Sequence, residues 1–333
     1  ETLKKIGRVY EEDGAWRFKI DTKKEKMIWQ DAVHGEIGFP TNVVEDFIII
    51  KSDGFPTYHF ASVVDDHEME ISHVFRGDEW ISSTPKHLQL YEAFDWEPPT
   101  FVHLPVILGV NKKKLSKREG AKSVMEFMDE GYLPEAIVNF LALLGWAPKT
   151  NQEVFSLQDL TKEFSLERIN KNSPIFNLEK LDWFNGQWIR KTSDSDLLKL
   201  IKPLNKNYNE PVILKALSIT KDRLNKISDF VKIADFFFNT PVLEKNIKEI
   251  SISKNTMQEL IAKLDQIDNW SESQISLLVT EIMDNQSLTK AQVYRSIGIA
   301  LSGNLITPPI FASMEILGKD ESIKRLKNAA TKI

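Results

Sequence analysis

A group of lysines between residues 109 and 124 is the first candidate for chemistry. The stretch GVNKKKLSKREGAKSV follows the apolar run TFVHLPVILGV and holds five basic residues between positions 112 and 118. Most lysine runs are only solvated turns. However, ligands of open α/β sheets bind outside the carboxyl ends of strands, which is where this loop would lie. Mobile ammonium groups there suit a polyphosphate. Because no Gly-x-x-x-x-Gly-Lys-Ser/Thr motif is present, a P-loop is not the explanation.

Carboxylates and histidines in DDHEMEISH form a second group, and a metal site is one interpretation of it. Asp65, Asp66, His67 and His73 could all be ligands. Neighbouring positions of a helix point to different faces, so Asp66 and His67 would not converge on one ion. We therefore expect no metal site there. With no cysteine in the chain, we also expect no structural zinc.

The elements that must position these groups follow an α/β pattern. Residues 1–50 alternate apolar and polar positions in short pieces, which is typical of β-structure. The stretch 56–70 has the hydrophobic period of a helix, and ISHVF has the pattern of a strand. Thr84 and Pro85 are typical of the N-cap and the first position of a further helix. TFVHLPVILGV is typical of a buried parallel strand. Alternating strands and helices predict an α/β fold.

Beyond residue 120 the pattern is helical almost throughout, as in LPEAIVNFLALLGW and FNLEKLDWFNGQWIR. The 333 residues are enough for two or more domains. No apolar run reaches the roughly 18 residues of a membrane helix, and the first residues do not read as a secretory signal, so we expect a cytoplasmic protein without membrane contact. The net charge of −5 argues against non-specific coating of nucleic acid.

Specific motifs resemble one family. KLSKR at 114–118 resembles the Lys-Met-Ser-Lys-Ser loop of class I aminoacyl-tRNA synthetases, and residues 52–107 resemble the catalytic core of bacterial-type glutamyl-tRNA synthetases. GYLPEAIVNFLALLGW, FNLEKLDWFNGQWIR and SGNLITPPIFASMEILGKDESIKRL continue this resemblance in order. It implies the second half of a Rossmann-type nucleotide-binding fold with a β-rich acceptor-stem segment, followed by an all-α anticodon-binding region.

The resemblance implies four parts of the chain. Residues 1–50 would complete the acceptor-stem domain, and 51–122 would form the second half of the catalytic domain. Residues 123–190 would contact the tRNA stem, and 191–333 would be the helical anticodon-binding domains.

The same resemblance implies an ATP site and a reaction. Such enzymes join glutamate to ATP, giving glutamyl-adenylate and pyrophosphate, and then transfer the glutamyl group to the 3′ end of tRNA(Glu). Lys117 and Lys114 would be the catalytic lysines that hold the phosphates. Ser116 and the backbone of Val106 and Ile107 would complete ATP binding. Mg²⁺ would arrive with ATP, and the protein itself would hold no metal.

The glutamate-binding residues implied by the resemblance are Tyr58, Arg76, Glu79 and Trp80. An arginine can grip a carboxylate with two parallel hydrogen bonds, which a lysine cannot do. For Arg76 the competing interpretation is a salt bridge to a nearby acid such as Asp65, Asp66 or Asp78. For Trp80 it is ordinary core packing.

Arg223 falls where the family carries an anticodon-reading arginine, although a surface arginine on a helix is usually only a solvated charge. Arginine can stack on and hydrogen-bond to unpaired bases. The expected partners are therefore tRNA(Glu), L-glutamate and ATP, and the expected state is a monomer. Whether tRNA(Gln) is also charged stays open.

One motif of the family is missing. The His-Ile-Gly-His sequence of class I synthetases does not occur, and none of the six histidines forms such a pair. We therefore expect a portion of a longer enzyme that forms no adenylate by itself. The alternatives are a non-catalytic tRNA-binding protein derived from a synthetase, which has no need of the lysine loop, and a tRNA-modifying glutamyl transferase, which would lack the helical C-terminal half. A glutaminyl enzyme is a further alternative, but residues 52–107 resemble the glutamyl type.

Overall fold

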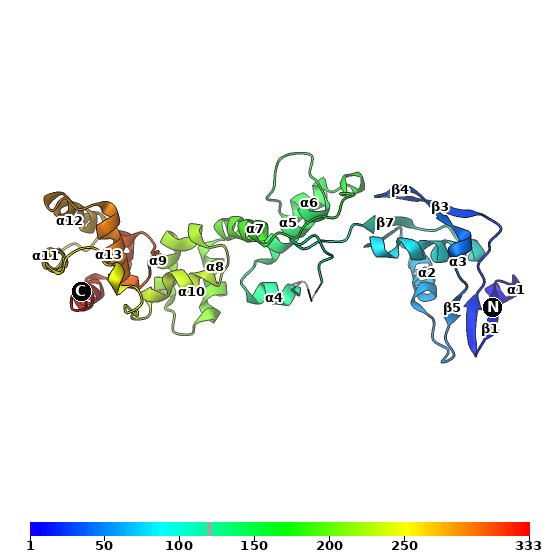
Figure 1. Ribbon diagram of the computed structural model, residues 1–333, viewed down its shortest axis with the longest axis horizontal. Helices are drawn as coiled ribbons and strands as arrows, with labels where there is room; N and C mark the ends of the chain where they lie inside the picture. The colour runs from blue at the N-terminus through cyan, green and yellow to red at the C-terminus, as the bar shows by residue number, and fades with distance from the viewer. Residues whose placement is uncertain (117, 119–121) are drawn as a thin grey trace. The chain divides into compact units, whose positions relative to one another are not determined.

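The computed structural model describes residues 1–116, 118 and 122–333 and divides into two compact units (Figure 1). The first unit comprises residues 1–122 and 138–178, and the second comprises 123–137 and 179–333. The roles expected for 1–50, 51–122, 123–190 and 191–333 stay predictions.

Two sheets form the framework of the first unit. Strands β1 (Val9–Glu12), β2 (Ala15–Phe18) and β5 (Phe47–Ile50) make an antiparallel sheet in the order β1-β2-β5. Strands β3 (Lys26–Asp31), β4 (Gly35–Pro40), β6 (His73–Gly77) and β7 (Thr100–Leu104) make the second, in the order β4-β3-β7-β6. In it β3, β7 and β6 are parallel, and β4 is antiparallel to β3. The predicted β-rich start is confirmed.

Helices connect these strands. Helix α2 (Tyr58–Glu68) leads from β5 to β6, and α3 (Thr84–Phe94) follows the 3₁₀ helix η2 (Asp78–Ser83) and returns the chain to β7. Because β6 and β7 are adjacent and parallel, α3 is the crossover of a βαβ unit. The α/β fold class predicted for this region is confirmed, with mixed sheets rather than purely parallel ones.

Two details differ from the sequence predictions. Thr84 is the first residue of α3 rather than its N-cap, with φ −56° and ψ −39°, and Ser83 precedes it. The hydroxyl of Thr84 accepts a hydrogen bond from Arg76 instead of capping the helix. The strand predicted over 100–110 ends at Leu104, because Pro105 has no N–H to continue the ladder.

Strand β7 is buried on both faces, whereas β3 alternates between exposed and buried residues. Phe101 packs into a core with Phe18 and Trp29, whereas Val102, the next residue, packs with Trp146 and Phe155. Successive side chains of a strand point to opposite faces, so β7 contributes to two cores at once. The other α-helices among the described residues of this unit are α1 (Thr2–Lys5), α6 (Leu157–Glu163) and the part of α5 (Pro134–Gly145) that follows Ile137.

All described elements of the second unit are helices, as predicted. Around one core lie the first residues of α5 together with α7 (Leu178–Lys191), α8 (Asp194–Ile201), α9 (Glu210–Thr220) and α10 (Asp229–Ala234). Helix α4 (Val124–Asp129) also belongs to this unit. The second core is built by α11 (Lys254–Leu264), α12 (Glu272–Asn285), α13 (Lys290–Ser302), α14 (Ile310–Leu317) and α15 (Lys319–Ala330). Short 3₁₀ helices join them, including η6 (Lys221–Arg223). Among the described residues no helix is long and apolar enough to cross a bilayer.

Candidate active site

The carboxyl ends of the three parallel strands bring charged and polar side chains together. Asp31 is the last residue of β3, and Arg76 and His103 are next to last in β6 and β7. Arg76 is the register partner of His103, and Asp31 is the partner of Phe101, two residues before His103 on the same face. The ring of Phe101 lies 5.1 Å from the Arg76 guanidinium. The register between these strands therefore places Asp31, Arg76 and His103 at the carboxyl ends of the strands, where open α/β sheets bind ligands.

Neutral acceptors surround the guanidinium of Arg76. Its Nε donates to Nε2 of His103 at 3.1 Å, one terminal nitrogen to Nδ1 of His87 at 3.2 Å, and the other to Oγ1 of Thr84 at 2.6 Å. Within residues 1–116, 118 and 122–333 no carboxylate forms an ion pair with it, so the salt bridge to Asp65, Asp66 or Asp78 is not formed. Burial lowers the pKa of Arg76, an effect that the fields of Tyr58, Asp66 and Asp31 oppose. Three of its five N–H groups are committed, and two are left for a ligand.

Two histidines, the buried His87 and the half-buried His59, continue this network. Nε2 of His87 lies 2.9 Å from Nδ1 of His59. Burial, followed by the charge of Arg76, lowers the pKa of His87 to about 3, and burial with the charges of Lys86 and Arg76 lowers the pKa of His59. Both rings are therefore neutral at pH 7, which lets His87 accept a hydrogen bond from the arginine.

Tyr58 and Trp80 complete an aromatic wall beside these histidines. Their ring centroids are 5.1 Å apart, and Trp80 is 6.2 Å from His59. Tyr58 is 58% exposed, whereas Trp80 is half-buried. The structure thus brings Tyr58, Arg76 and Trp80 into one site, as a shared ligand would require.

Glu79 has a different partner. Its carboxylate accepts a hydrogen bond from the Lys114 ammonium at 2.8 Å, and this bond holds the pKa of Glu79 below its usual range. Both side chains are about half exposed, so the ion pair contributes little to stability. Its significance is positional, because it joins the lysine loop to η2, which also carries Trp80.

The lysine loop begins as a small hairpin. Leu115 N–H donates to the carbonyl of Ile107, and Gly109 N–H donates to that of Lys113, each at 2.8 Å. Leu108 is bonded in turn to the segment 174–176. Val106 and Ile107 are half-buried and follow β7 rather than end it, while Ser116 is exposed. Lys117, the lysine expected to be most important, lies outside the described residues.

The histidines and Asp31 were not recognised from the sequence as site residues. A usable signal was present at His103, a polar residue inside the apolar strand FVHLPV, since a buried polar group needs a hydrogen-bond partner. For metals, no three His, Asp or Glu side chains of the described residues converge on one point. His67 stacks on Trp96 at 3.8 Å instead.

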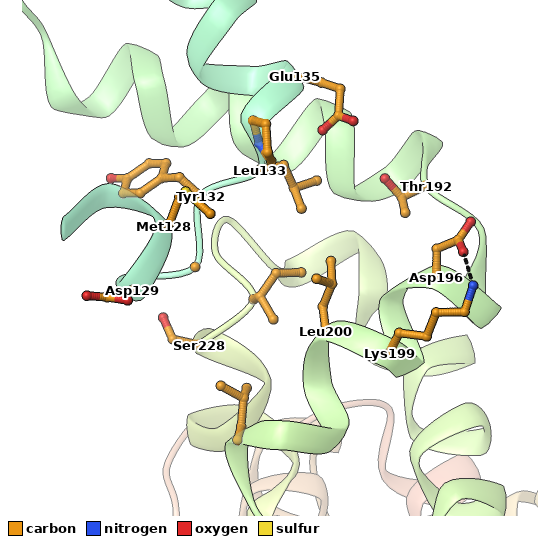
Figure 2. A pocket seen from close by; sticks show the side chains of 14 residues that line it. Met128, Asp129, Tyr132, Leu133, Glu135, Thr192, Asp196, Lys199, Leu200 and Ser228 are labelled. Carbon is orange, nitrogen blue, oxygen red and sulfur yellow. Dashed lines mark hydrogen bonds and ion pairs between the residues drawn. The ribbon is translucent and has the colours of Figure 1, made fainter. Parts of the chain in front are cut away.

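The second unit contains a separate cavity of about 510 Å³, shown in Figure 2. Its rim carries the carboxylates of Asp129, Glu135 and Asp196, and its lysine, Lys199, is paired with Asp196 at 2.8 Å. An acidic rim of this kind would repel a polyphosphate. The cavity is therefore no candidate for the ATP site.

Arg223 lies in the same unit, in η6. It is exposed and donates to the carbonyl of Thr307 at 2.6 Å. The residue before Thr307, Ile306, is 85% exposed. The exposed guanidinium of Arg223 is a group on which an unpaired base can stack, although the anticodon role of Arg223 stays a prediction.

Comparison with known proteins shows the family. The catalytic domain of class I tRNA synthetases (E and Q) matches residues 3–183, and an anticodon binding domain matches 196–330. The chain is 37% identical over 345 residues to a glutamate–tRNA ligase of Dehalococcoides mccartyi strain CBDB1, an alignment that covers 98% of this chain and 70% of that protein. The chain belongs to the glutamate–tRNA ligase family. Its fold class and anticodon-binding region are those of this family.

Further relatives agree with this assignment. Glutamate–tRNA ligase 1 of Fervidobacterium nodosum is 42% identical over 306 residues, covering 91% of this chain and 64% of that protein. The crystal structure of a glutamate tRNA ligase from Elizabethkingia meningosepticum superposes with a TM-score of 0.85 at 32% identity, covering 99% of this chain and 70% of that one. The chain thus spans about two thirds of the length of these ligases.

Proposed function

We propose that this protein is a glutamate–tRNA ligase that converts ATP and L-glutamate to glutamyl-adenylate and pyrophosphate and then transfers the glutamyl group to the 3′ end of tRNA(Glu). The proposal rests on the environment of Arg76. Its guanidinium is half-buried, and the three described groups that accept hydrogen bonds from it are neutral. No carboxylate of the described residues is in direct contact with this half-buried cation, so the site favours an anionic ligand. A carboxylate of the substrate would supply it.

The reaction assigns that carboxylate. The α-carboxylate of glutamate must attack the α-phosphorus of ATP, which leaves the side-chain carboxylate for Arg76. Two parallel N–H···O bonds from the uncommitted N–H groups would hold it, with Tyr58 and Trp80 alongside. Such a contact would favour glutamate over glutamine, whose amide offers the guanidinium a second donor in place of an acceptor.

The ATP side of the proposal rests on the lysine loop. Lys114 and Lys117 would bind the phosphates and stabilise the charge that develops on the leaving pyrophosphate, with Ser116 and the backbone of Val106 and Ile107 contributing to ATP binding. Mg²⁺ would enter as part of the nucleotide substrate, held by the phosphates and water. Glu79 would keep Lys114 close to the glutamate pocket through the bond at 2.8 Å.

The part of the proposal that concerns tRNA binding rests on the helical unit. Arg223 would contact anticodon bases of tRNA(Glu), since arginine recognises unpaired bases by stacking and hydrogen bonding. Action in the cytoplasm and a monomeric state belong to the same proposal.

The substitution Arg76→Lys tests the proposed glutamate site. In the protein produced from its complete gene, Arg76→Lys should raise the KM for glutamate about 10- to 100-fold, because the bidentate geometry is lost while the charge is kept. The KM for ATP should change little. Steady-state aminoacylation kinetics measure both values.

The matched control is Arg295→Lys, at an exposed ion pair in the helical unit. It should leave both KM values unchanged. An unchanged glutamate KM in Arg76→Lys would refute the assigned role of Arg76. No glutamate activation by the wild-type product of the complete gene would favour the alternative of a non-catalytic tRNA-binding protein.

We also propose that these 333 residues form no adenylate by themselves. The motif His-Ile-Gly-His does not occur in them, and positioning and charge stabilisation in class I enzymes require both walls of the ATP site. Glutamate- and tRNA-dependent ATP–pyrophosphate exchange should be absent with the isolated chain and present with the product of the complete gene. Robust exchange by the isolated chain would contradict this part of the proposal.

A further inference from the structure

We propose that Asp31 is a positioning residue for Arg76: it holds His103 in the one tautomer whose Nε2 can accept a hydrogen bond from the guanidinium. The inference rests on the proposed role of Arg76 in glutamate binding. It concerns three strands that meet only in the folded sheet, through Asp31 on β3, His103 on β7 and Arg76 on β6.

The hydrogen-bonding partners of His103 leave one neutral form. Its Nδ1 lies 2.6 Å from Oδ2 of Asp31, and its Nε2 lies 3.1 Å from Nε of Arg76 and 3.2 Å from Oγ1 of Thr84, a hydroxyl that can donate to it. An ionised carboxylate can only accept, and a guanidinium can only donate. Nδ1 must therefore carry the proton, and Nε2 must be the acceptor. In the other tautomer two donors would face each other at Arg76.

Asp31 is well suited to this role because it is itself fixed. Its side chain is fully buried, and Oδ1 accepts the backbone N–H groups of Val33 and His34, both at 3.0 Å. Burial raises its pKa, but the hydrogen bonds from His103 and the two backbone groups outweigh burial and leave the pKa below its usual value. The group is thus a carboxylate at neutral pH.

The arrangement places a negative charge near Arg76 without a direct ion pair. Asp31 acts through the ring of His103, so the guanidinium gains an oriented acceptor and a nearby counter-charge while two of its N–H groups stay uncommitted. A substrate carboxylate then has no protein carboxylate to displace. His87 and Thr84 hold the other side of the guanidinium by accepting hydrogen bonds from its two terminal nitrogens, and neither contributes a carboxylate.

The substitution Asp31→Asn tests whether Asp31 sets the tautomer of His103. The amide oxygen can keep the two backbone N–H groups, while the NH₂ group takes the place of Oδ2 and donates to Nδ1 of His103. The ring must then carry its proton on Nε2, against Arg76. In the product of the complete gene we expect the glutamate KM to rise about 10- to 100-fold, with the KM for ATP nearly unchanged.

A spectroscopic readout separates this inference from the proposed function. Long-range ¹H–¹⁵N correlations of the His103 ring, recorded on the 333-residue chain, should show Nδ1–H in the wild type and Nε2–H in Asp31→Asn. The matched control is Asp46→Asn, since Asp46 also accepts a backbone N–H at 2.8 Å, from Ile20. It should leave both the His103 spectrum and the glutamate KM unchanged.

A double-mutant cycle tests whether Asp31 acts through His103. In His103→Gln the side-chain oxygen can replace Nε2 as acceptor and no longer depends on a ring tautomer, so adding Asp31→Asn should cause no further rise in the glutamate KM. An additive rise would overturn the proposal.

Two more results would also overturn it. One is a wild-type His103 ring protonated on Nε2, which can be observed even if Asp31→Asn does not fold. The other is a switched tautomer with an unchanged glutamate KM. If Arg76→Lys also leaves that KM unchanged, the proposed function fails as well; if Arg76→Lys raises it, only the role of Asp31 is refuted.

Discussion

At Arg76 two effects oppose each other, desolvation of the guanidinium and the hydrogen bonds that it gains. The site compensates burial with histidine and threonine acceptors, and it keeps His87 neutral by burying it beside the cation. A neutral histidine accepts from arginine, whereas a protonated one would repel it. The chemistry of the site therefore depends on keeping these rings deprotonated.

His87 predicts a pH dependence of stability. Its pKa of about 3 in the native state lies below the usual value of 6.5, so the native state binds fewer protons than the unfolded state between these values. The free energy of unfolding should therefore fall as the pH drops below about 6.5, by up to about 1.4 kcal/mol per pH unit from this group. His87→Asn keeps an acceptor for Arg76 and cannot titrate, so its stability should fall less steeply in urea unfolding between pH 7 and pH 4.

The control for this measurement is His73→Asn, at an exposed position whose side chain contacts Ser72. It should leave the pH slope of the wild type unchanged. Equal slopes for His87→Asn and the wild type would show that His87 takes up its proton in the native state.

At the scale of the elements, tertiary hydrogen bonds hold the turn between α4 and α5. Gly131 has φ +93°, and its carbonyl accepts from Ile227 N–H at 3.0 Å and from the buried amide of Asn185 at 3.2 Å. Asn185 also accepts from Leu133 N–H at 2.8 Å and donates to the carbonyl of Asn225. One buried amide thus satisfies backbone groups of two loops, so the start of α5 is fixed by tertiary contacts as well as by Pro134.

Gly131→Ala should destabilise the helical unit for two reasons. The left-handed backbone costs about 1 to 2 kcal/mol for an alanine. In addition, its Cβ would lie 2.8 Å and 2.9 Å from the backbone nitrogens of Ser228 and Ile227, which should add about 1 to 3 kcal/mol. Denaturant unfolding followed by circular dichroism measures the total.

Gly54→Ala is the matched control. Gly54 has φ +84°, and a Cβ there would meet no atom within 4 Å, so only the backbone cost is expected. Equal losses of stability at the two positions would show that the loop of Ile227 and Ser228 moves aside.

At the scale of the whole molecule, the proposed glutamate site and the proposed anticodon contact belong to different units. The sheet site lies in the first unit, and Arg223 lies in the second. Substitutions in one unit should therefore affect the kinetic parameters of one substrate more than those of the others.

Arg223→Ala should raise the KM for tRNA(Glu) by about 10-fold or more, as loss of a contact to a base does, and leave the glutamate KM unchanged. Aminoacylation by the product of the complete gene, with purified tRNA(Glu) and tRNA(Gln), measures this and shows whether the second tRNA is charged. Arg295→Ala, at another exposed arginine of the same unit, serves as the control. An unchanged KM for tRNA(Glu) would contradict the anticodon role of Arg223.

The sequence by itself determined the elements and the type of fold. The local signals are the alternation over residues 1–50, the helical periods after residue 120 and the β-branched run before the lysine loop. The structure confirms the elements that they predict, except that the strand before the loop ends at Leu104. Family motifs also identified Tyr58, Arg76 and Trp80, which the fold brings together.

Only the tertiary structure decided how Arg76 is held. Asp31 and His103 are 72 residues apart in the sequence, His59 and His87 are 28 apart, and their contacts follow from the strand order β3-β7-β6 and the packing of helices beside it. At Thr84 the local rule predicts a helix cap, yet the hydroxyl bonds to Arg76. Hydrogen-bond partners across a sheet depend on register and strand order, and neither is encoded in the residues next to a given position.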